Sequence, residues 1–473
     1  MKNSLNRKPA RARKTFWRNA ASAGALTAAA LGGALVTAAV LSAGFARSTI
    51  SADTFRQLDL FGEVFEQVHQ NYVETPEDAK LVKGAIDGML AGLDPHSSYM
   101  DAENFSRMQE QTRGSFAGLG IQVVMDNEGP DKGYVKVIAP IDDTPAQRAG
   151  IQTNDLISEI DGVAVQGQTI DEAIEKLKGA KGTPVEITVI RDREKPAFKV
   201  KLVRDIVRVA AVTHRVEGQY GFIRISNFSE QTEDGLVKAF KSFDKDIPGG
   251  AKGYVLDLRS NPGGLLDQAV AVSDSFLEGG EIVSTRGRNP KDTLKEMGTA
   301  GDLAKGKPVI VLIDGGSASA SEIVAGALQD RNRALLLGTK SFGKGSVQTV
   351  IPLQNGLQGA LRLTTARYYT PSGRSIQAEG IDPDIMMPVL YPGQEEEGEH
   401  PTEASLPGAL DVKKDKEAGV KAQPAIEPVK CGYKEDGKTF KDCQLERALS
   451  ILADTTAYRS ALADASAGRA KAQ

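Results

Sequence analysis

The spacing of apolar residues changes along the chain, and each spacing predicts a different kind of structure. Phe55–Tyr72 and Lys80–Ala91 carry apolar side chains at helical spacing. Arg113–Arg204 alternates strand-like runs with Gly-rich turns and two short helical patterns. From Ile206 to about Pro388, short apolar runs of strand type are each followed by a helical pattern, which is typical of a layered α/β core. We therefore expect a multidomain α/β (α+β) chain.

The first helical pattern has an apolar stripe that needs a surface to cover it. Packing onto the same chain is the favoured interpretation, and pairing with a second copy is the alternative. For the whole protein we expect a homo-oligomer.

The N-terminus has the pattern of a targeting segment. Met1–Arg18 is basic, and Ala20–Ala46 is a run of 27 residues without a charge, longer than the roughly 20 residues that cross a bilayer. This charge asymmetry keeps the first residues in the cytoplasm and sends the rest outward. "GFA" before Arg47 fits a cleavage site, whereas the long apolar run favours a retained anchor; an Ala-rich core helix is a further alternative. We expect a periplasmic or otherwise extracytoplasmic protein, attached to the inner (cytoplasmic) membrane if the segment is retained.

The balance of basic and acidic residues bears on whether the protein binds nucleic acid. Of 58 Lys and Arg residues, eight lie in residues 1–50, which contain no acid, so the remainder has 50 basic against 62 acidic groups. Such an acidic body argues against nucleic acid as a partner. No His, Glu or Cys cluster has the spacing of metal ligands, so we expect no metal and no cofactor.

The C-terminal part changes character twice. Residues 389–430 are rich in Pro, Gly and charge and poor in large apolar groups, which predicts a mobile, disordered linker. Beyond it, Asp442 is placed to cap a final helix that runs through Ala453. Cys431 and Cys443 flank a turn and could form a disulfide in an oxidising compartment, or remain two buried thiols.

Three serines lie between an apolar run and a helical pattern, in "GGSASASE". A serine at a helix N-terminus is exposed to unpaired N–H groups that stabilise developing negative charge, as a nucleophile requires. The alternative is a helix cap, because Ser is a common N-cap residue. We interpret Ser319 as the nucleophile, Ser317 as a turn residue and Ser321 as the cap.

A base for this serine is found more readily among lysines than among histidines. None of the four histidines has a Gly-rich, strand-end context: His69, His96, His214 and His400. Lys344 lies between Gly343 and Gly345, with Gln348 four residues on. A lysine with a pKa near its ordinary value of about 10.4 is rarely neutral at pH 7, but burial lowers that pKa. The alternative is a solvated loop lysine.

The segment after Arg113 resembles a PDZ domain of the kind found in bacterial proteases. The resemblance rests on the "GLGI" loop, Gly118–Ile121, and on "TPAQRAGIQTNDLI", Thr144–Ile157. Consecutive N–H groups of Gly118, Leu119 and Gly120 can bind a terminal carboxylate, and the strand from Ile121 offers an edge to a peptide. The alternative is a Gly-rich turn that only joins two elements.

The chain from Phe55 to about Pro388 resembles the carboxy-terminal processing peptidases, the tail-specific serine proteases. The motifs that carry the resemblance are "LDLRSNPGGLL", "GSASASEIVAGALQD", "GTKSFGKGSVQ" and "TARYYTPSGRSIQAEGI". The family's fold implies a layered, crotonase-like α/β peptidase core.

The resemblance also implies roles for individual residues. The family's nucleophile matches Ser319, its general base matches Lys344 and its lysine-orienting glutamine matches Gln348. The oxyanion hole would combine the N–H of Ala320 with one from Gly263 or Gly264. An aspartate that contributes in some members matches Asp330, for which a helix-end solvent group is an equal alternative.

The function that follows is an exported serine endopeptidase that captures substrate C-termini through its PDZ domain and cleaves near them with a Ser/Lys dyad. Its partners would be polypeptides with accessible apolar C-termini, with an adaptor protein as a further candidate. A catalytically inactive PDZ scaffold or chaperone is the alternative, disfavoured because Ser319, Lys344 and Gln348 are all present. A crotonase-like acyl-CoA enzyme is disfavoured by the export signal and the peptide-binding module.

The expected domain organisation has six parts. They are a basic N-terminus with signal peptide or anchor (1–50), an N-terminal helical segment (51–112), a PDZ-like domain (113–204), a serine peptidase core (205–388), a disordered linker (389–430) and a C-terminal helical tail (431–473).

Overall fold

The computed structural model describes residues 51–127, 131–393, 401–411, 426–436 and 438–472. The chain divides into two compact units, with the boundary between Asp78 and Ala79. The predicted N-terminal anchor lies outside the described residues. Among the residues that are described, no helix is long and apolar enough to cross a membrane.

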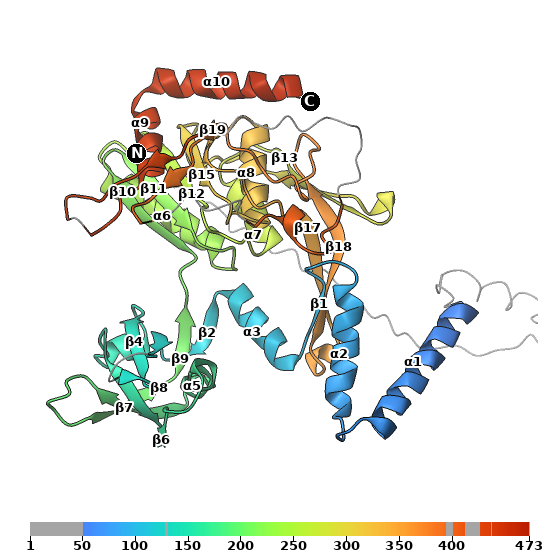
Figure 1. Ribbon diagram of the computed structural model, residues 1–473. Helices are drawn as coiled ribbons and strands as arrows, with labels where there is room; N and C mark the ends of the chain where they lie inside the picture. The colour runs from blue at the N-terminus through green and yellow to red at the C-terminus, as the bar shows by residue number, and fades with distance from the viewer. Residues whose placement is uncertain (1–50, 128–130, 394–400, 412–425, 437, 473) are drawn as a thin grey trace, which may run out of the picture. The chain divides into compact units, whose positions relative to one another are not determined.

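The N-terminal unit contains helix α1, Ala52–Asn71 (Figure 1). Its N-cap is Ser51, whose hydroxyl accepts the main-chain N–H of Thr54 at 3.1 Å. The predicted helical pattern is confirmed here. Its apolar side chains are exposed, with Phe55, Leu58 and Phe61 each more than half accessible.

The second unit begins with helices around a short strand. Helix α2 spans Asp78–Ala91, strand β1 spans Ser98–Met100 and helix α3 spans Ala102–Arg113. Helix α3 ends at Gly114, whose φ of 63° is the left-handed conformation that glycine adopts readily.

The segment expected to be PDZ-like forms an antiparallel sheet in the order β3-β4-β5-β7-β8. Its strands are β3 (Ile121–Met125), β4 (Val135–Pro140), β5 (Leu156–Ile160), β7 (Pro184–Ile190) and β8 (Phe198–Val203), with β6 (Val163–Ala164) paired to β5. The two short helical patterns expected in this segment form helix α4 (Pro145–Arg148) and the amphipathic helix α5 (Ile170–Leu177). Strands β2 (Ser115–Gly118) and β9 (Asp205–Arg208) pair where the chain enters and leaves this segment.

The segment expected to form the peptidase core is built on a six-stranded sheet in the order β10-β11-β12-β15-β16-β19. Its strands are β10 (Val212–Glu217), β11 (Tyr220–Ile225), β12 (Tyr254–Asp257), β15 (Val309–Ile313), β16 (Leu335–Gly338) and β19 (Ile385–Met386). All neighbours are parallel except β10 and β11. Every residue of β12, β15 and β16 is buried, which explains why these strands are apolar except for Asp257 at the end of β12.

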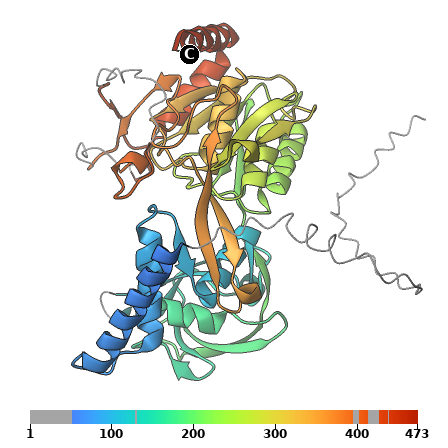
Figure 2. The ribbon, with the colours of Figure 1, turned by 90° about the vertical axis from the view of Figure 1, so that its right-hand side faces the viewer.

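Helices cover both faces of this sheet (Figures 1 and 2). Alternate side chains of the central strands pack with helices α6 (Thr232–Asp246), α7 (Leu266–Asp274) and α8 (Ala320–Asp330). The opposite side chains pack with α9 (Cys443–Ala453) and α10 (Thr455–Ala472) from the C-terminal tail. The tail is therefore a layer of the core, and the predicted helix capped by Asp442 is confirmed.

A second, antiparallel sheet carries strand β17, which follows the predicted base. Its order is β1-β18-β13-β14, with β17 paired to β18. The strands are β13 (Gly280–Gly287), β14 (Leu294–Gly298), β17 (Ser346–Pro352) and β18 (Ala360–Tyr369). Single 3-10 turns lie at η2 (Pro290–Asp292) and η3 (Gln354–Gly356).

The structure differs from the expected disordered linker over 389–430 wherever it describes those residues. Strand β20 (Val389–Leu390) pairs with β21 (Val429–Lys430), and Glu403–Ser405 forms the 3-10 helix η4. The side chain of Glu403 is fully buried. Composition misjudged these parts because their order comes from contacts between residues distant in sequence rather than from a local apolar pattern.

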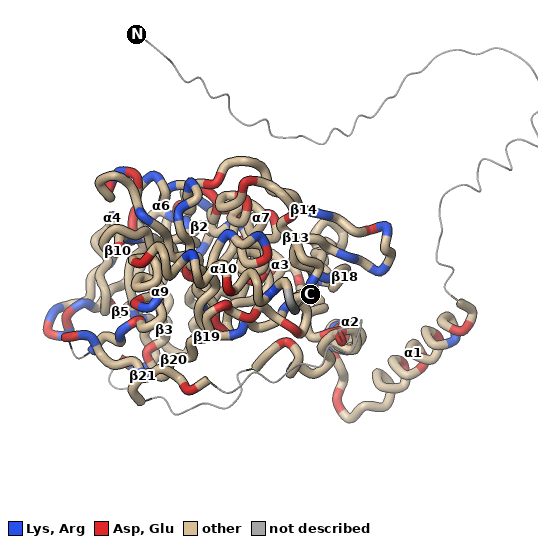
Figure 3. Tube along the Cα trace, turned by 90° about the horizontal axis from the view of Figure 1, so that it is seen from above, with Lys and Arg blue, Asp and Glu red and all other residues tan. Residues whose placement is uncertain are grey.

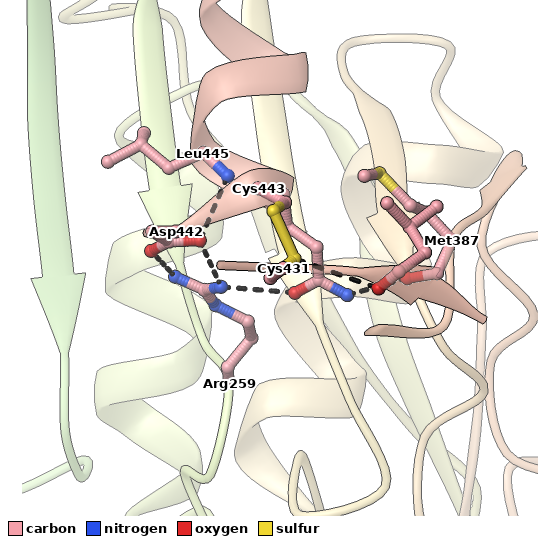
Figure 4. The surroundings of a disulfide bond; sticks show 8 residues. Arg259, Met387, Cys431, Asp442, Cys443 and Leu445 are labelled. Carbon is pink, nitrogen blue, oxygen red and sulfur yellow. Dashed lines mark hydrogen bonds and ion pairs between the residues drawn. A yellow bond between two sulfur atoms is a disulfide. The ribbon is translucent and has the colours of Figure 1, made fainter. Parts of the chain in front are cut away.

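A disulfide joins Cys431 to Cys443, with 6.1 Å between their Cα atoms, which decides between the two alternatives left open for these cysteines. Figure 4 shows it beside an ion-pair cluster at the start of α9. Arg259 binds both oxygens of Asp442, at 2.9 and 2.7 Å, and also binds Asp257 at the end of β12. The disulfide thus closes a loop within the tail, and the ion pairs of Arg259 join the start of α9 to the end of β12.

Lys and Arg lie interspersed with Asp and Glu along the described chain (Figure 3). This distribution agrees with the argument against a nucleic-acid partner, which stays a prediction.

Candidate active site

The three serines have three different environments. Ser317 and Ser321 are fully buried, and their hydroxyls donate to the carbonyl oxygens of Leu258 and Asn261, each at 2.9 Å. Ser319 is partly exposed and is itself the N-cap residue of α8. The interpretation of Ser321 as the cap was therefore wrong, because its hydroxyl is needed to hold the neighbouring loop.

Ser319 has a strained main chain. Its φ of 53° and ψ of −111° lie in a region that residues with a side chain rarely adopt. Such a conformation costs on the order of 1–3 kcal/mol and is common at functional sites. The strain arises where the chain turns sharply from β15 into α8, and it sets the serine apart from its neighbours.

Gly263 packs directly against this turn. A Cβ atom on Gly263 would lie 2.9 Å from both Ala320 N and Ser319 Cβ, so a larger residue would push the two loops apart. The N–H of Gly263 donates to Asn261 Oδ1 at 2.9 Å. Because that donor is already engaged, this geometry favours Gly264 over Gly263 as the second predicted oxyanion donor, beside Ala320.

Glu322 links the serine turn to the lysine loop. Its side chain is fully buried, and its Oε2 accepts the main-chain N–H groups of Ser319 and Lys344 at 2.8 and 2.9 Å. Its Oε1 accepts the Ser341 hydroxyl at 2.6 Å and the Gly343 N–H at 2.7 Å. Burial raises the pKa of Glu322 to about 7, while these donors act in the opposite sense.

One carboxylate oxygen therefore brings the main chains of Ser319 and Lys344 within two hydrogen-bond lengths of each other. Sequence reasoning missed Glu322, although the Ser-x-x-Glu spacing at the start of α8 is a capping-box signal that could have identified it.

Lys344 lies in a partly buried loop between two glycines. A Cβ on Gly345 would lie 2.1 Å from Gln377 N, so the expected close packing of this loop holds at that position. Burial is the main cause that lowers the pKa of Lys344, and Arg362 lowers it further. Glu403, Glu322 and Asp94 act in the opposite sense. The amine is thus easier to deprotonate than that of a solvated lysine.

Gln348 lies on β17, and its side-chain amide binds two hydroxyl groups rather than the amine of Lys344. Its amide nitrogen donates to Ser346 Oγ at 2.8 Å and to Thr364 Oγ1 at 3.3 Å. Thr364 in turn donates to Asp94 at 3.0 Å. The predicted role of Gln348 in orienting the amine stays a prediction.

A second buried carboxylate, that of Glu403 in η4, lies beside the lysine loop. Glu403 receives a hydrogen bond from Gln377, and its oxygens lie 3.0 and 2.7 Å from His96 Nε2. No local sequence pattern could have identified Glu403, because its position depends on contacts between distant segments.

The other three histidines have no contact with the serine turn or the lysine loop among the interactions of the described residues. His69 lies 3.3 Å from Asp78 in the N-terminal unit, His214 packs edge-on against Phe243, and His400 lies outside the described residues.

Asp330 is buried and accepts hydrogen bonds from Ser372 N and Arg374, each at 3.0 Å. Asp330 is therefore a structural anchor for the 370–374 turn in this structure rather than a group exposed to solvent.

The predicted peptide-binding residues line a cavity of about 220 Å³ in the PDZ domain. Its walls are mostly apolar and comprise Phe116, Gly118, Leu119, Gly120, Ile121, Val123, Ile174, Leu177 and Lys178. The carbonyl oxygens of Leu119 and Gly120 accept the N–H groups of Ala146 and Ile141, which fixes the loop. A Cβ on Gly120 would lie 2.3 Å from that of Thr144, so this position requires glycine.

Comparison with known families identifies three segments. Residues 219–387 match peptidase family S41, residues 136–191 match the PDZ domain, and residues 38–104 match the N-terminal domain of the activating protease CtpB.

Individual proteins are similar over most of the chain. A carboxy-terminal-processing protease of Bartonella bacilliformis is 55% identical over 346 residues, which cover 72% of this chain and 78% of that protein. A probable CtpA-like serine protease of Staphylococcus aureus is 36% identical over 332 residues, 69% of this chain and 64% of that protein. The solved structure of a photosystem II D1 C-terminal processing protease is 28% identical and covers 69% of this chain and 92% of that one, with a TM-score of 0.40.

Proposed function

Because the chain belongs to the carboxy-terminal processing peptidases of family S41, which are serine-type peptidases, we propose that it cleaves polypeptides with a dyad of Ser319 and Lys344. The observation that carries this proposal is the shared hydrogen-bond acceptor Glu322 Oε2, which binds the main-chain N–H of both residues. A serine and a lysine held by one buried carboxylate can work as a unit.

The steps of acyl transfer follow from this arrangement. The Lys344 amine takes the proton of Ser319 Oγ as the oxygen attacks the scissile carbonyl, and the resulting oxyanion accepts N–H groups of Ala320 and Gly264. The ammonium returns the proton to the leaving amine, and water activated by Lys344 then hydrolyses the acyl-enzyme. Burial favours the neutral amine that starts the cycle, because it lowers the pKa of Lys344.

Substrate selection belongs to the PDZ domain in this proposal. An extended peptide adds to the edge of β3, with its terminal carboxylate at the Gly118–Gly120 loop and its last side chain in the apolar cavity. Substrates are therefore polypeptides with accessible apolar C-termini. Export to the periplasm, attachment to the inner membrane through residues 1–50, an adaptor protein and assembly into a homo-oligomer complete the proposal.

The experiment compares the full-length parent with Ser319→Ala and Lys344→Ala on an unfolded polypeptide that ends in apolar residues. Each variant should lower kcat/KM by at least about a thousandfold, because an acyl-transfer unit fails when either member is lost. Lys340→Ala is the matched control, since Lys340 is a half-exposed lysine of the same loop. Cleavage by both variants at the parental rate would show that the dyad is wrong.

Amidation of the substrate C-terminus tests the PDZ step separately. It should raise KM for the parent while leaving cleavage dependent on Ser319. If no variant and no substrate is cleaved, an inactive PDZ scaffold becomes the better reading, and binding of the free-acid peptide but not of its amide would support it.

A further inference from the structure

Segment 401–411 places a buried carboxylate, that of Glu403, next to the lysine loop. Glu403 belongs to a short polar segment outside the α/β core, yet its side chain is only 1% exposed. Its main-chain N–H donates to the carbonyl oxygen of Phe342 at 3.0 Å, two residues before Lys344. Burial of a carboxylate is costly unless its oxygens are well paired, so this position calls for a physical explanation.

A chain of hydrogen bonds runs from Glu403 to the residue after Lys344. Gln377 Nε2 donates to Glu403 Oε1 at 2.9 Å, and Gln377 Oε1 accepts the N–H of Gly345 at 3.1 Å. Glu403 therefore contacts the lysine loop on both sides of Lys344: directly at Phe342 and through Gln377 at Gly345.

His96 binds the opposite side of the carboxylate. Its Nε2 lies 2.7 and 3.0 Å from the two oxygens, and because a carboxylate only accepts, Nε2 carries the proton. The hydrogen bonds from His96 and Gln377 outweigh the desolvation of Glu403 and keep its pKa below the ordinary value. Glu403 is thus negatively charged at neutral pH.

From this geometry we propose that Glu403 is a positioning residue for Lys344, which fixes the lysine loop through Phe342 and Gln377. The proposal rests on the proposed function only in that it takes Lys344 to be the base. Four charged groups act on the pKa of the Lys344 amine: Arg362 from β18 lowers it, whereas Glu403 from η4, Glu322 from α8 and Asp94 from the turn after α2 raise it. Of the three carboxylates, Glu403 makes the largest contribution toward a higher pKa of Lys344.

The charge is tested with Glu403→Gln, which removes the negative charge but keeps an acceptor oxygen for Gln377, while His96 can change to its other tautomer and accept from the new NH₂ group. The pKa of Lys344 is measured directly, by competitive acylation of lysines over a pH series with peptide mass spectrometry. We expect it to fall by about one unit, the size of effect of a nearby opposite charge. The acid limb of the kcat/KM profile should move to lower pH by the same amount.

The anchoring is tested with Glu403→Ala, which also removes the hydrogen bond from Gln377. Hydrogen exchange of the Gly343–Gly345 amides should speed up at least about tenfold in this variant and stay close to parental in Glu403→Gln. The matched control is Glu379→Gln, which removes an exposed carboxylate two residues after Gln377. It should change neither measurement.

The two proposals fail in distinguishable ways. If Glu403→Gln leaves the pKa of Lys344 equal to that in Glu379→Gln, or if Glu403→Ala leaves exchange of the loop unchanged, the role of Glu403 is wrong. Acylation and exchange need no catalysis and can be repeated in Ser319→Ala. If Lys344→Ala cleaves like the parent, the dyad fails, while these two measurements still decide the role of Glu403. Should Glu403→Ala not fold, Glu403→Gln and its pKa measurement decide alone.

Discussion

At the scale of single residues, Glu322 determines the relation between the two residues of the proposed dyad. All four hydrogen-bond donors around it point at oxygen: the Ser341 hydroxyl and the N–H groups of Ser319, Gly343 and Lys344. A carboxylate satisfies this arrangement because both of its oxygens accept. A carboxamide cannot, because its NH₂ group must face two of the donors.

We therefore predict that Glu322→Gln is harmful although it preserves shape. It should lower the free energy of unfolding by about 1–3 kcal/mol, the cost of leaving buried donors unpaired, and reduce kcat more than KM because the serine turn and the lysine loop separate. Denaturant unfolding and steady-state kinetics measure the two effects. Glu379→Gln serves as the control. A variant with parental kcat would mean that the shared carboxylate is not needed to hold the dyad.

The same residue predicts a pH dependence of stability. Its pKa is raised on folding from 4.5 to about 7, so its protonation stabilises the fold fully below pH 4.5, and this stabilisation is lost as the pH rises through about 7. The loss is roughly 3 kcal/mol. Between pH 5 and 8 the parent should lose more of its free energy of unfolding than Glu322→Gln does, and equal slopes would contradict the prediction.

At the scale of elements, the strands and helices that could be predicted are those whose own apolar residues show strand or helix spacing. Strand β15 is apolar throughout, and β12 is apolar up to its last residue, because both faces of the sheet are covered there. The spacing of apolar residues in α5 and α9 shows which face of each helix is buried. These elements could be predicted from sequence alone. The predicted roles of Ser319 and Lys344 also came from local motifs and from a resemblance.

The parts that could not be predicted depend on distant contacts. Segment 401–411 looks like a solvated linker because its composition is polar, yet Glu403 is buried by His96 and Gln377, which lie far away in sequence. Serine is a common helix cap, but the hydroxyl of Ser321 donates a hydrogen bond to the carbonyl oxygen of Asn261 instead. In both cases a partner from another element outweighs the local propensity.

The attachment of α9 gives a prediction about the tail. The Cys431–Cys443 disulfide closes a loop with a sequence separation of 12, next to the Arg259–Asp442 pair of Figure 4. Replacing both cysteines with serine should lower the free energy of unfolding by about 2–3 kcal/mol, the typical effect of a short closed loop.

Hydrogen exchange in this double variant should speed up first in α9 and leave β15 protected. Reduction of the parent should reproduce the effect and leave the double variant unchanged. Equal stability of the parent before and after reduction would contradict a structural role for the bond.

At the scale of the whole molecule, the apolar surface of α1 supports the proposed homo-oligomer. Within the N-terminal unit, helix α1 has no buried residue, and its stripe includes Phe55, Leu58 and Phe61, each more than half exposed. Large exposed apolar patches mark interaction sites in soluble proteins. A second copy of α1 is the partner that we propose for this stripe, because its sequence supplies a matching apolar surface.

We predict that the double variant Leu58→Asp and Phe61→Asp dissociates the assembly, because two charges in the stripe would have to be buried without partners. Sedimentation of the full chain in detergent should give an oligomer for the parent and a monomer for the variant. Glu63→Lys, a change of charge at an exposed polar position of the same helix, should keep the parental mass. A monomeric parent would contradict the homo-oligomer, and an oligomeric variant would place the interface on another surface.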